Sequence, residues 1–205
     1  DVLLTLASKK AAAKEVLFRM YSSGAKSNRD EWVYVFSRTA LVERMKYFME
    51  RYGKEVSEQD GDLDMTIKWS RDLKLKLRQG KAPAFNSDLV RPSLWRPYTK
   101  QFFYAEKVVV DVMTEKHYRM FGPELTSANR VLAVSGFSAA KPFQTLSADA
   151  LADYEHIEKS NIFPLYQYTS DGKKEDNLTD WGLAQFATHY VKESLRGQGP
   201  RDITK

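Results

Sequence analysis

Cysteine is absent from the 205 residues of this chain. Its absence excludes disulfide bonds, cysteine-based zinc sites and thiol nucleophiles, and it fits a protein of the reducing cytoplasm. Histidine is scarce: His117, His156 and His189 lie far apart and lack the spacing of a metal-binding pair. We therefore expect no metal site, and we interpret the histidines as isolated, partly buried side chains.

Long apolar runs and catalytic motifs are lacking as well. No stretch of eighteen apolar residues occurs, so no membrane contact is expected, and no basic segment precedes the first apolar residues as in a secretory signal. The glycine-rich loops that bind dinucleotides or phosphates, the Gly-x-Ser-x-Gly elbow and the motifs of an AdoMet-dependent adenine methyltransferase are missing. We predict no catalytic residues and no cofactor here. Because the chain begins with Asp rather than Met, we interpret it as a fragment of a longer protein.

What the chain does have is a concentrated basic stretch. Residues 68–107 hold ten Lys and Arg against three Asp and Glu, which gives 10 − 3 = +7, so the remaining residues sum to 5 − 7 = −2. Such a local excess suits a polyanion, because contacts to phosphates release counterions. A basic face that is merely solvated accounts for the same count, so the charge leaves both interpretations open.

Apolar spacing and turn residues give a coarse map of the chain. Helices are predicted over residues 9–20, over residues 39–52 with Ser37 as a cap, and after Thr179 as a cap. Residues 108–122 are expected to be a loop leading into a short helix, and residues 170–176 a loop. Strands are predicted over residues 32–36, 89–98, 101–105, 130–136, 143–148 and 155–168. This order predicts an α+β fold with a mixed, mainly antiparallel sheet and flanking helices.

Residues 68–80 permit two interpretations. Leu73, Leu75 and Leu77 alternate as in a strand, whereas Trp69, Leu73 and Leu77 are four apart as in a helix. We favour the helix, because Gly80 is well placed to end it. One face of that helix would then carry four cations: Arg71, Lys74, Arg78 and Lys81.

The segment "RPSLWRPYTKQFFYAEK" (91–107) combines aromatic rings with cations. Pro92 and Pro97 cannot donate to a strand ladder, so we expect edge-like or bulged strands at those points. The rings are interpreted as core side chains, namely Trp95, Tyr98, Phe102, Phe103 and Tyr104. Similarly, "NRDEW" (28–32) is interpreted as a structural joint in which Arg29 pairs with an acid.

Five blocks, taken in order, resemble a known family. They are "GAKSNRDEWVYVFSR" (24–38), "IKWSRDLKLKLRQGK" (67–81), "RPSLWRPYTKQFFYAEK" (91–107), "NRVLAVSGFSAAKPF" (129–143) and "HIEKSNIFPLYQY" (156–168). Together they resemble the target-recognition region of type ISP single-polypeptide restriction-modification enzymes. Type IIG and MmeI-like enzymes show a looser version of the same pattern.

The resemblance implies that this chain is one domain of a longer chain whose other domains carry the catalytic functions. In that family a nuclease, a helicase-like translocase and an adenine-N6 methyltransferase precede the recognition domain, so AdoMet, ATP and Mg belong to the upstream domains. It implies that this chain binds double-stranded DNA in a sequence-specific way, contacts the methyltransferase, and presents an adenine for extrusion. The expected boundaries are a helical lead-in (1–23), the recognition domain (24–170) and the start of a C-terminal helical segment (171–205).

Charge and loop position select candidate DNA contacts. Lys and Arg side chains hold phosphates, whereas sequence is read at base edges. The expected phosphate contacts are Arg71, Lys74, Arg78, Lys81, Lys100 and Lys141. The candidate base or backbone contacts are Arg91, Arg96, Gln101 and Ser138.

Three alternatives stay open. Arg96, between Trp95 and Pro97, equally suits a structural stacking or ion-pairing role. The second hypothesis, after DNA binding, is a spacer or protein-interaction module whose basic stretch docks onto the methyltransferase or the translocase. The Asp-x-Lys pair of Asp72 and Lys74 occurs in metal-dependent nucleases, although no partner acid stands out upstream.

Overall fold

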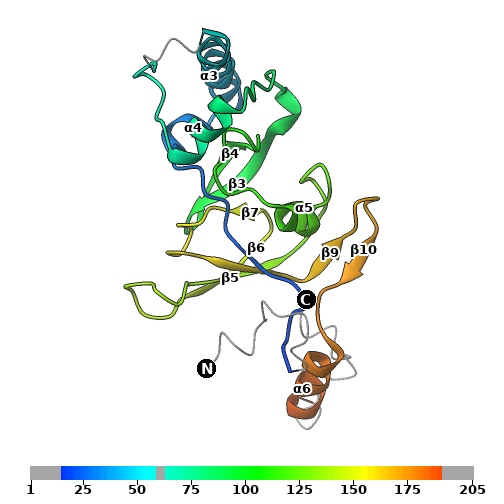
Figure 1. Ribbon diagram of the computed structural model, residues 1–205. Coiled ribbons are helices and arrows are strands. Elements are labelled where there is room, and N and C mark those ends of the chain that lie inside the picture. Colours follow the sequence, from blue (N-terminus) through cyan, green and yellow to red (C-terminus); the bar gives the residue numbers. More distant parts are fainter. Residues whose placement is uncertain (1–14, 59–62, 191–205) are drawn as a thin grey trace.

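The structure, a computed structural model, describes residues 15–58 and 63–190 (Figure 1). Figure 1 places helices α3 and α4 at one end of the molecule and α6 at the other, with the strands between them. The elements in chain order are β1 (Ser22–Ser23), α2 (Asp30–Val33), β2 (Tyr34–Val35), α3 (Arg38–Glu58), α4 (Arg71–Arg78), β3 (Val90–Arg96), β4 (Thr99–Tyr104), α5 (Glu115–Phe121), β5 (Val131–Val134), β6 (Thr145–Ala148), β7 (Leu151–Ala152), β8 (Asn161–Pro164), β9 (Tyr166–Tyr168), β10 (Lys174–Asp176) and α6 (Asp180–Tyr190).

Two four-stranded sheets carry the fold, in the orders β1-β8-β5-β6 and β2-β4-β3-β7, and β9 and β10 form a separate hairpin. Strands pair antiparallel except β3 and β7, which run parallel. Only Asp149 and Ala150 separate β6 from β7, so the chain passes from one sheet to the other within two residues. The predicted α+β class with mainly antiparallel sheets is confirmed.

Helix α3 follows the predicted apolar spacing. Leu41, Met45, Phe48, Met49 and Tyr52 are its buried residues, so one stripe of the helix faces the core. The side chain of Ser37 accepts a hydrogen bond from the amide of residue 40 at 3.3 Å, as expected of a cap. The helix extends six residues beyond the predicted end.

Strand predictions succeeded at the two hairpins, β3–β4 and β5–β6. Strands β3 and β4 flank the turn at residues 97–98, and the register shifts between Leu94 and Arg96, so β3 is bulged there as expected near a proline. Pro92 pairs with Phe102 of β4 only, because β7 pairs with Ser93 and Leu94, so β3 is an edge at Pro92 as expected. Strand β5 is buried between β8 and β6, as predicted for residues 130–136.

Four local predictions were wrong. Of the strand predicted over residues 155–168, residues 155–160 form no strand, and only residues 161–164 and 166–168 do. Residues 30–33 form the helical turn α2, because the carbonyl of Arg29 accepts from the amides of Trp32 and Val33, and only Tyr34 and Val35 form a strand. Residues 174–176 form β10 rather than part of a loop. Of the helix predicted over residues 9–20, residues 9–14 lie outside the described part, and residues 15–20 are not helical.

One apolar cluster joins α3, α4, both sheets and α5. A smaller cluster pairs Val134 and Phe163 with Leu17, Phe18 and Tyr21, so the segment before β1 packs against β5 and β8. No helix in the described part of the chain is long and apolar enough to cross a membrane.

Candidate nucleic-acid interface

Helix α4 presents cations at an open hollow. Ser70 caps the helix by accepting from the amide of Leu73 at 3.1 Å, and Leu73 is the side chain that anchors the helix in the core. The hollow has a volume of about 490 Å³ and is lined by Trp69, Ser70, Arg71, Lys74, Leu75 and Arg78. Three of the predicted phosphate contacts therefore gather at one place, and the helix predicted for residues 68–80 is confirmed over residues 71–78.

The cations of this helix face are available to a ligand. Arg71, Lys74, Arg78 and Lys81 are exposed, and no ion pair within residues 15–58 and 63–190 engages them. Four free positive charges within three helical turns repel one another in the absence of an anion, so the arrangement favours a bound polyanion. Lys81 follows Gly80, whose φ of +65° ends the helix.

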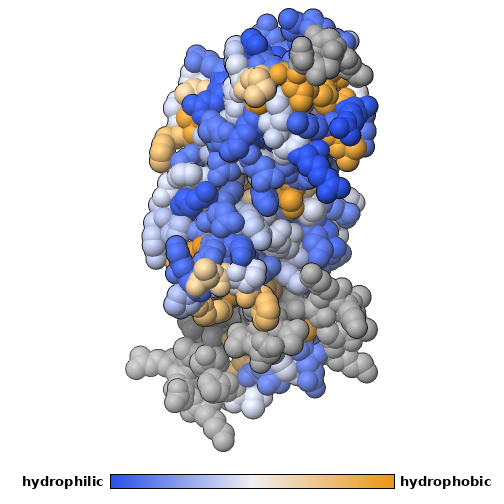
Figure 2. Space-filling model, turned by 60° about the vertical axis from the view of Figure 1, so that its left-hand side comes forward, coloured by the Kyte–Doolittle hydropathy of each residue, from blue (hydrophilic) through white to orange (hydrophobic). Residues whose placement is uncertain are grey.

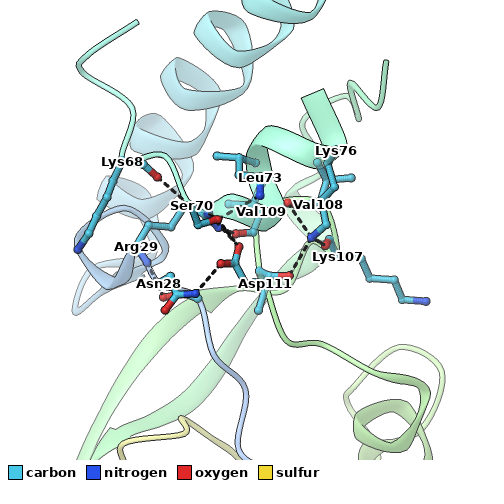
Figure 3. Close-up of polar contacts among 12 residues, drawn as sticks. Asn28, Arg29, Lys68, Ser70, Leu73, Lys76, Lys107, Val108, Val109 and Asp111 are labelled. Atoms are coloured by element: carbon cyan, nitrogen blue, oxygen red, sulfur yellow. Dashed lines mark hydrogen bonds and ion pairs between the residues drawn. The ribbon is translucent and has the colours of Figure 1, made fainter. Parts of the chain in front are cut away.

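A buried ion pair fixes the first turn of α4 (Figure 3). Arg29 donates to the Ser70 hydroxyl at 2.6 Å, to the Asp111 carboxylate at 2.9 Å and to the carbonyl of Val109. The Ser70 hydroxyl in turn donates to Asp111 at 2.9 Å, and Asn28 donates to the other oxygen of that carboxylate. Burial lowers the pKa of Arg29, and Asp111 opposes this shift. The predicted structural joint is thus present, with Asp111 as the acid.

Lys76 fixes the other end of α4. Its ammonium donates to the carbonyls of Lys107 at 2.5 Å, Val108 at 3.1 Å and Val110 at 3.2 Å (Figure 3). Burial lowers the pKa of Lys76, while Asp111 acts in the opposite direction. Lys76 is therefore a structural cation, although it lies between the exposed cations Lys74 and Arg78 on the same short helix.

The cations of the β3–β4 hairpin all have partners within the protein. Arg91 donates to the carbonyl of residue 124 at 2.8 Å. Arg96 pairs with Asp153 at 2.8 Å and with Asp30 at 3.2 Å, and it lies 4.3 Å from the ring centre of Trp95. Lys100 pairs with the exposed Asp149 at 2.8 Å. Arg96 therefore has the geometry of the structural alternative, whereas Lys100 is held by an exposed pair of the kind that contributes little.

The remaining candidates lie on the other sheet or within the hairpin. Ser138 and Lys141 are exposed in the loop between β5 and β6, and the carboxylate of Glu158 accepts from the amides of residues 140 and 141. The carbonyl of Ser138 accepts from Lys159 at 2.6 Å. Gln101 is half-buried in β4 opposite Ser93. The structure therefore does not bring these residues into the α4 hollow.

One exposed ring corrects the expectation for the hairpin. Phe103 and Tyr104 are fully buried and Trp95 and Phe102 partly buried, as expected of core rings, but Tyr98 is 89% exposed at the turn. A turn signal was available in the sequence, because a proline favours a turn at the residue that follows it.

Of the two buried histidines in the described residues, His117 is held by hydrogen bonds to the backbone. His117 Nδ1 accepts from the amide of Thr114 at 2.9 Å, so Nε2 carries the proton and donates to the carbonyl of Ser23 at 3.0 Å. His156 is buried as well. Asp72 is exposed in the first turn of α4, and no group of three metal-binding side chains occurs in residues 15–58 and 63–190.

The surface in Figure 2 is hydrophilic over most of its area, with apolar groups in small separate patches. A large contiguous apolar face of the kind that marks a stable protein–protein contact is not seen on this side.

Comparison with known proteins identifies the family. The model of the type ISP C-terminal specificity domain matches residues 16–203. The chain belongs to this family. The family predicted from the five sequence blocks is therefore confirmed. No curated protein matches the chain.

Solved structures share the fold of this specificity domain. A DrdV–DNA complex has 30% identity and a TM-score of 0.83, and the match covers 93% of this chain and 20% of that one. The type ISP enzyme LlaGI, in a nuclease-deletion mutant bound to a DNA substrate mimic, has 22% identity and a TM-score of 0.76, covering 97% and 17%. LlaBIII, an ATP-dependent type ISP enzyme bound to DNA, has 22% identity and a TM-score of 0.77, covering 97% and 13%. The specificity domain spans at most a fifth of these chains.

Proposed function

We propose that this specificity domain binds double-stranded DNA in a sequence-specific way and serves as the target-recognition domain of a larger restriction-modification enzyme. The observation that carries the proposal is the α4 hollow, where Arg71, Lys74 and Arg78 are exposed and free of ion pairs within the described residues. Family membership and the DNA complexes of DrdV, LlaGI and LlaBIII support the choice of DNA as the polyanion.

In this proposal α4 sets the register of the domain on the duplex. Its cations contact phosphates, which fix position and orientation without reading sequence. Base edges would be read from the β3–β4 hairpin and the β5–β6 loop, which carry Arg91, Gln101 and Ser138, while Lys100 and Lys141 in the same two segments would contact phosphates. Arg29 and Lys76 would hold α4 in place on the body of the domain, because Arg29 binds the N-cap Ser70 and Lys76, near the other end of α4, binds the carbonyl of Lys107.

The role in the parent enzyme is part of the same proposal. By gripping the duplex beside the target, the domain would determine which adenine an upstream methyltransferase extrudes for N6 methylation, and where translocation and cleavage begin. AdoMet, ATP and Mg would bind to those upstream domains. Residues 1–23 would lead in from the methyltransferase, residues 24–170 would form the recognition unit, and residues 171–205 would open a C-terminal helical segment.

Duplex binding as a function of salt tests the proposal. The chain is titrated with duplexes selected by binding from a randomised pool, and with scrambled duplexes, between 50 and 200 mM salt, over which a phosphate-dominated affinity falls by orders of magnitude. Replacing Arg71, Lys74 and Arg78 by Ala should lower the slope of log K against log salt by about 0.9 for each lost contact. Salt-insensitive binding, or equal affinity for scrambled duplexes, contradicts the proposal.

A charge-matched control separates a local from a general effect. Lys54, Lys116 and Lys173 are exposed cations on α3, on α5 and in the β9–β10 turn, and replacing them by Ala removes the same total charge. That variant should keep nearly all of the affinity. If the α4 variant binds DNA normally but loses association with the methyltransferase, the spacer function is the correct one.

A further inference from the structure

The turn between β3 and β4 holds an aromatic ring in solvent. Tyr98 is 89% exposed, and no hydrogen bond, ion pair or ring contact engages its side chain within the described part of the chain. Aromatic rings are usually placed where their area is buried, as Phe103 and Tyr104 are in the same hairpin. A fully exposed ring at the tip of a hairpin therefore requires a reason other than the stability of the fold.

The backbone at Tyr98 is unfavourable for this residue. Its φ is +60°, in the left-handed region that a residue with a bulky side chain adopts only at a cost in free energy. A proline followed by a residue of positive φ is the pattern of a type II turn, in which glycine or asparagine is the ordinary choice after proline. Tyrosine is thus costly here both for its exposed ring and for its backbone, and such strain is typical of functional positions.

The hairpin behind the ring is held firmly. Arg96, two residues before Tyr98, forms ion pairs with Asp153 and Asp30 and stacks on the ring of Trp95. Asp30 directly follows Arg29, which binds the N-cap of α4. Two consecutive residues therefore connect the end of the hairpin to the basic helix, so that Tyr98 and the α4 cations belong to one rigid unit.

The surroundings of the ring favour DNA over a protein partner. Pro97 and Lys100 are exposed, Thr99 is half-buried, and Phe102 and Phe103 pack into or against the core, so the hairpin itself adds no second exposed ring to Tyr98. Protein interfaces bury contiguous patches of rings and apolar chains. A two-stranded hairpin fits the major groove of DNA. Inserted side chains can open a base step, and aromatic rings stack on the faces of unstacked bases.

We propose that Tyr98 is a base-contacting wedge that enters the duplex at the end of the β3–β4 hairpin while α4 holds the phosphates; the inference rests on the proposed DNA binding. The ring gains contact with the face of a base at a locally opened step. The rigid hairpin presents that ring without the ordering cost that a mobile loop would carry. The exposed ring and the strained turn then have a common explanation.

Variants at Tyr98 test the wedge because stability and binding should change in opposite directions. Tyr98→Gly relieves the backbone strain, so its Tm should equal or exceed that of the unaltered chain. Its affinity for the duplex selected from a randomised pool should fall about tenfold, the effect of losing one stacked base. Tyr98→Phe keeps the ring and should retain the affinity. Tyr47→Ala removes another exposed ring, on α3 and outside the hairpin, and should leave the affinity unchanged.

A base analogue in the DNA reports the contact directly. Duplexes of the selected sequence that carry 2-aminopurine at successive positions should brighten at one step when the unaltered chain binds, and Tyr98→Gly should abolish the change. If the chain binds DNA in the salt-dependent way but Tyr98→Gly binds equally well, the wedge alone is refuted. If the unaltered chain binds no duplex, the proposed function fails first and the wedge fails with it. If Tyr98→Gly impairs only association with the methyltransferase domain, the ring is a protein contact and the wedge is wrong.

Discussion

The guanidinium of Arg29 lies 2.9 Å from the carboxylate of Asp111, and the two side chains are 0% and 1% exposed. The pair joins three segments that are distant in sequence: the approach to α2, the cap of α4 and the loop after β4. A buried charge pair is tolerated when its remaining donors and acceptors are satisfied, and here Ser70, Val109 and Asn28 complete the network. The Arg29–Asp111 pair therefore fixes the position of the start of the basic helix α4.

Removal of Arg29 should destabilise the domain strongly. Arg29→Met leaves the carboxylate of Asp111 buried without its partner, which should lower the free energy of unfolding by about 3–5 kcal/mol. Arg29→Met combined with Asp111→Asn should cost less than the sum of the two single changes, because neither charge is then left alone. Urea denaturation measures all of these. Lys54→Met, which breaks the exposed pair with Glu58, is the control and should change stability by less than about 1 kcal/mol.

Lys74 and Lys76 lie on the same helix, α4, but their replacement should affect different properties. Loss of Lys76 should lower stability, whereas loss of Lys74 should weaken DNA binding. Lys76→Met removes the donor to three carbonyls and should lower the free energy of unfolding by about 1–3 kcal/mol. Lys74→Met changes an exposed side chain and should alter stability by no more than about 0.5 kcal/mol. Under the proposed function only Lys74→Met should reduce the salt slope of DNA binding, by about 0.9. Equal effects of the two changes on stability would contradict the assignment of Lys76 as a structural cation.

The helices could be predicted where apolar spacing and a capping residue coincide. Leu41 to Tyr52 repeat at helical intervals after Ser37, and α6 begins after Thr179, whose hydroxyl accepts from the amide of residue 182 at 2.9 Å. By contrast, the "WVYVF" segment has strong strand propensity, yet its first residues follow Arg29 into a helical turn. The position of Arg29 is fixed by Asp111, and such a long-range contact overrides local propensity.

Three of the candidate DNA contacts could be grouped from the sequence, because Arg71, Lys74 and Arg78 follow from a single helical period. The roles of other cations depend on residues that no local pattern identifies. Arg96 pairs with acids 57 and 66 residues away, and Lys76 binds carbonyls more than thirty residues away. A sequence pattern therefore gives the sign of a charge and the helix face on which it lies. Which acid or carbonyl binds that charge depends on tertiary structure.

Asp153 should make stability depend on pH. Burial and the neighbouring Asp30 raise the pKa of Asp153 to about 6, against the opposing effects of Glu155's amide and of Arg96. Because the folded-state pKa exceeds the unfolded value of about 4, the folded protein binds this proton more tightly. The stability that the group contributes is therefore full below pH 4 and is lost as the pH rises through about 6, by at most about 3 kcal/mol.

Asp153→Asn isolates this effect. The variant loses a charge partner of Arg96, so its stability differs from that of the unaltered protein at every pH, and the informative quantity is how the difference changes. The free energy of unfolding of the unaltered protein minus that of the variant should fall between pH 4 and pH 7 and stay constant above pH 7. Urea denaturation at four or five pH values measures it. A difference that rises with pH would mean that Arg96 dominates and that the pKa of Asp153 is lowered.

Two glycines should respond in opposite ways to replacement by alanine. Gly24 lies against the backbone of the segment after β7, where an added Cβ would be 2.6 Å from the carbonyl carbon of Asp153 and 2.7 Å from the nitrogen of Tyr154. Neither backbone atom can move freely, because both amides donate hydrogen bonds: that of Asp153 to the carbonyl of Leu94, and that of Tyr154 to the carbonyl of Ala25. Gly24→Ala should therefore lower the free energy of unfolding by about 1–3 kcal/mol.

Gly53 lies within α3 with open space at its Cβ. Gly53→Ala should raise the free energy of unfolding by about 0.5–1 kcal/mol, because alanine has a higher helix propensity than glycine. Thermal unfolding of both variants checks this, and a neutral Gly24→Ala would show that the contact between the first segment and β7 yields more readily than the structure indicates.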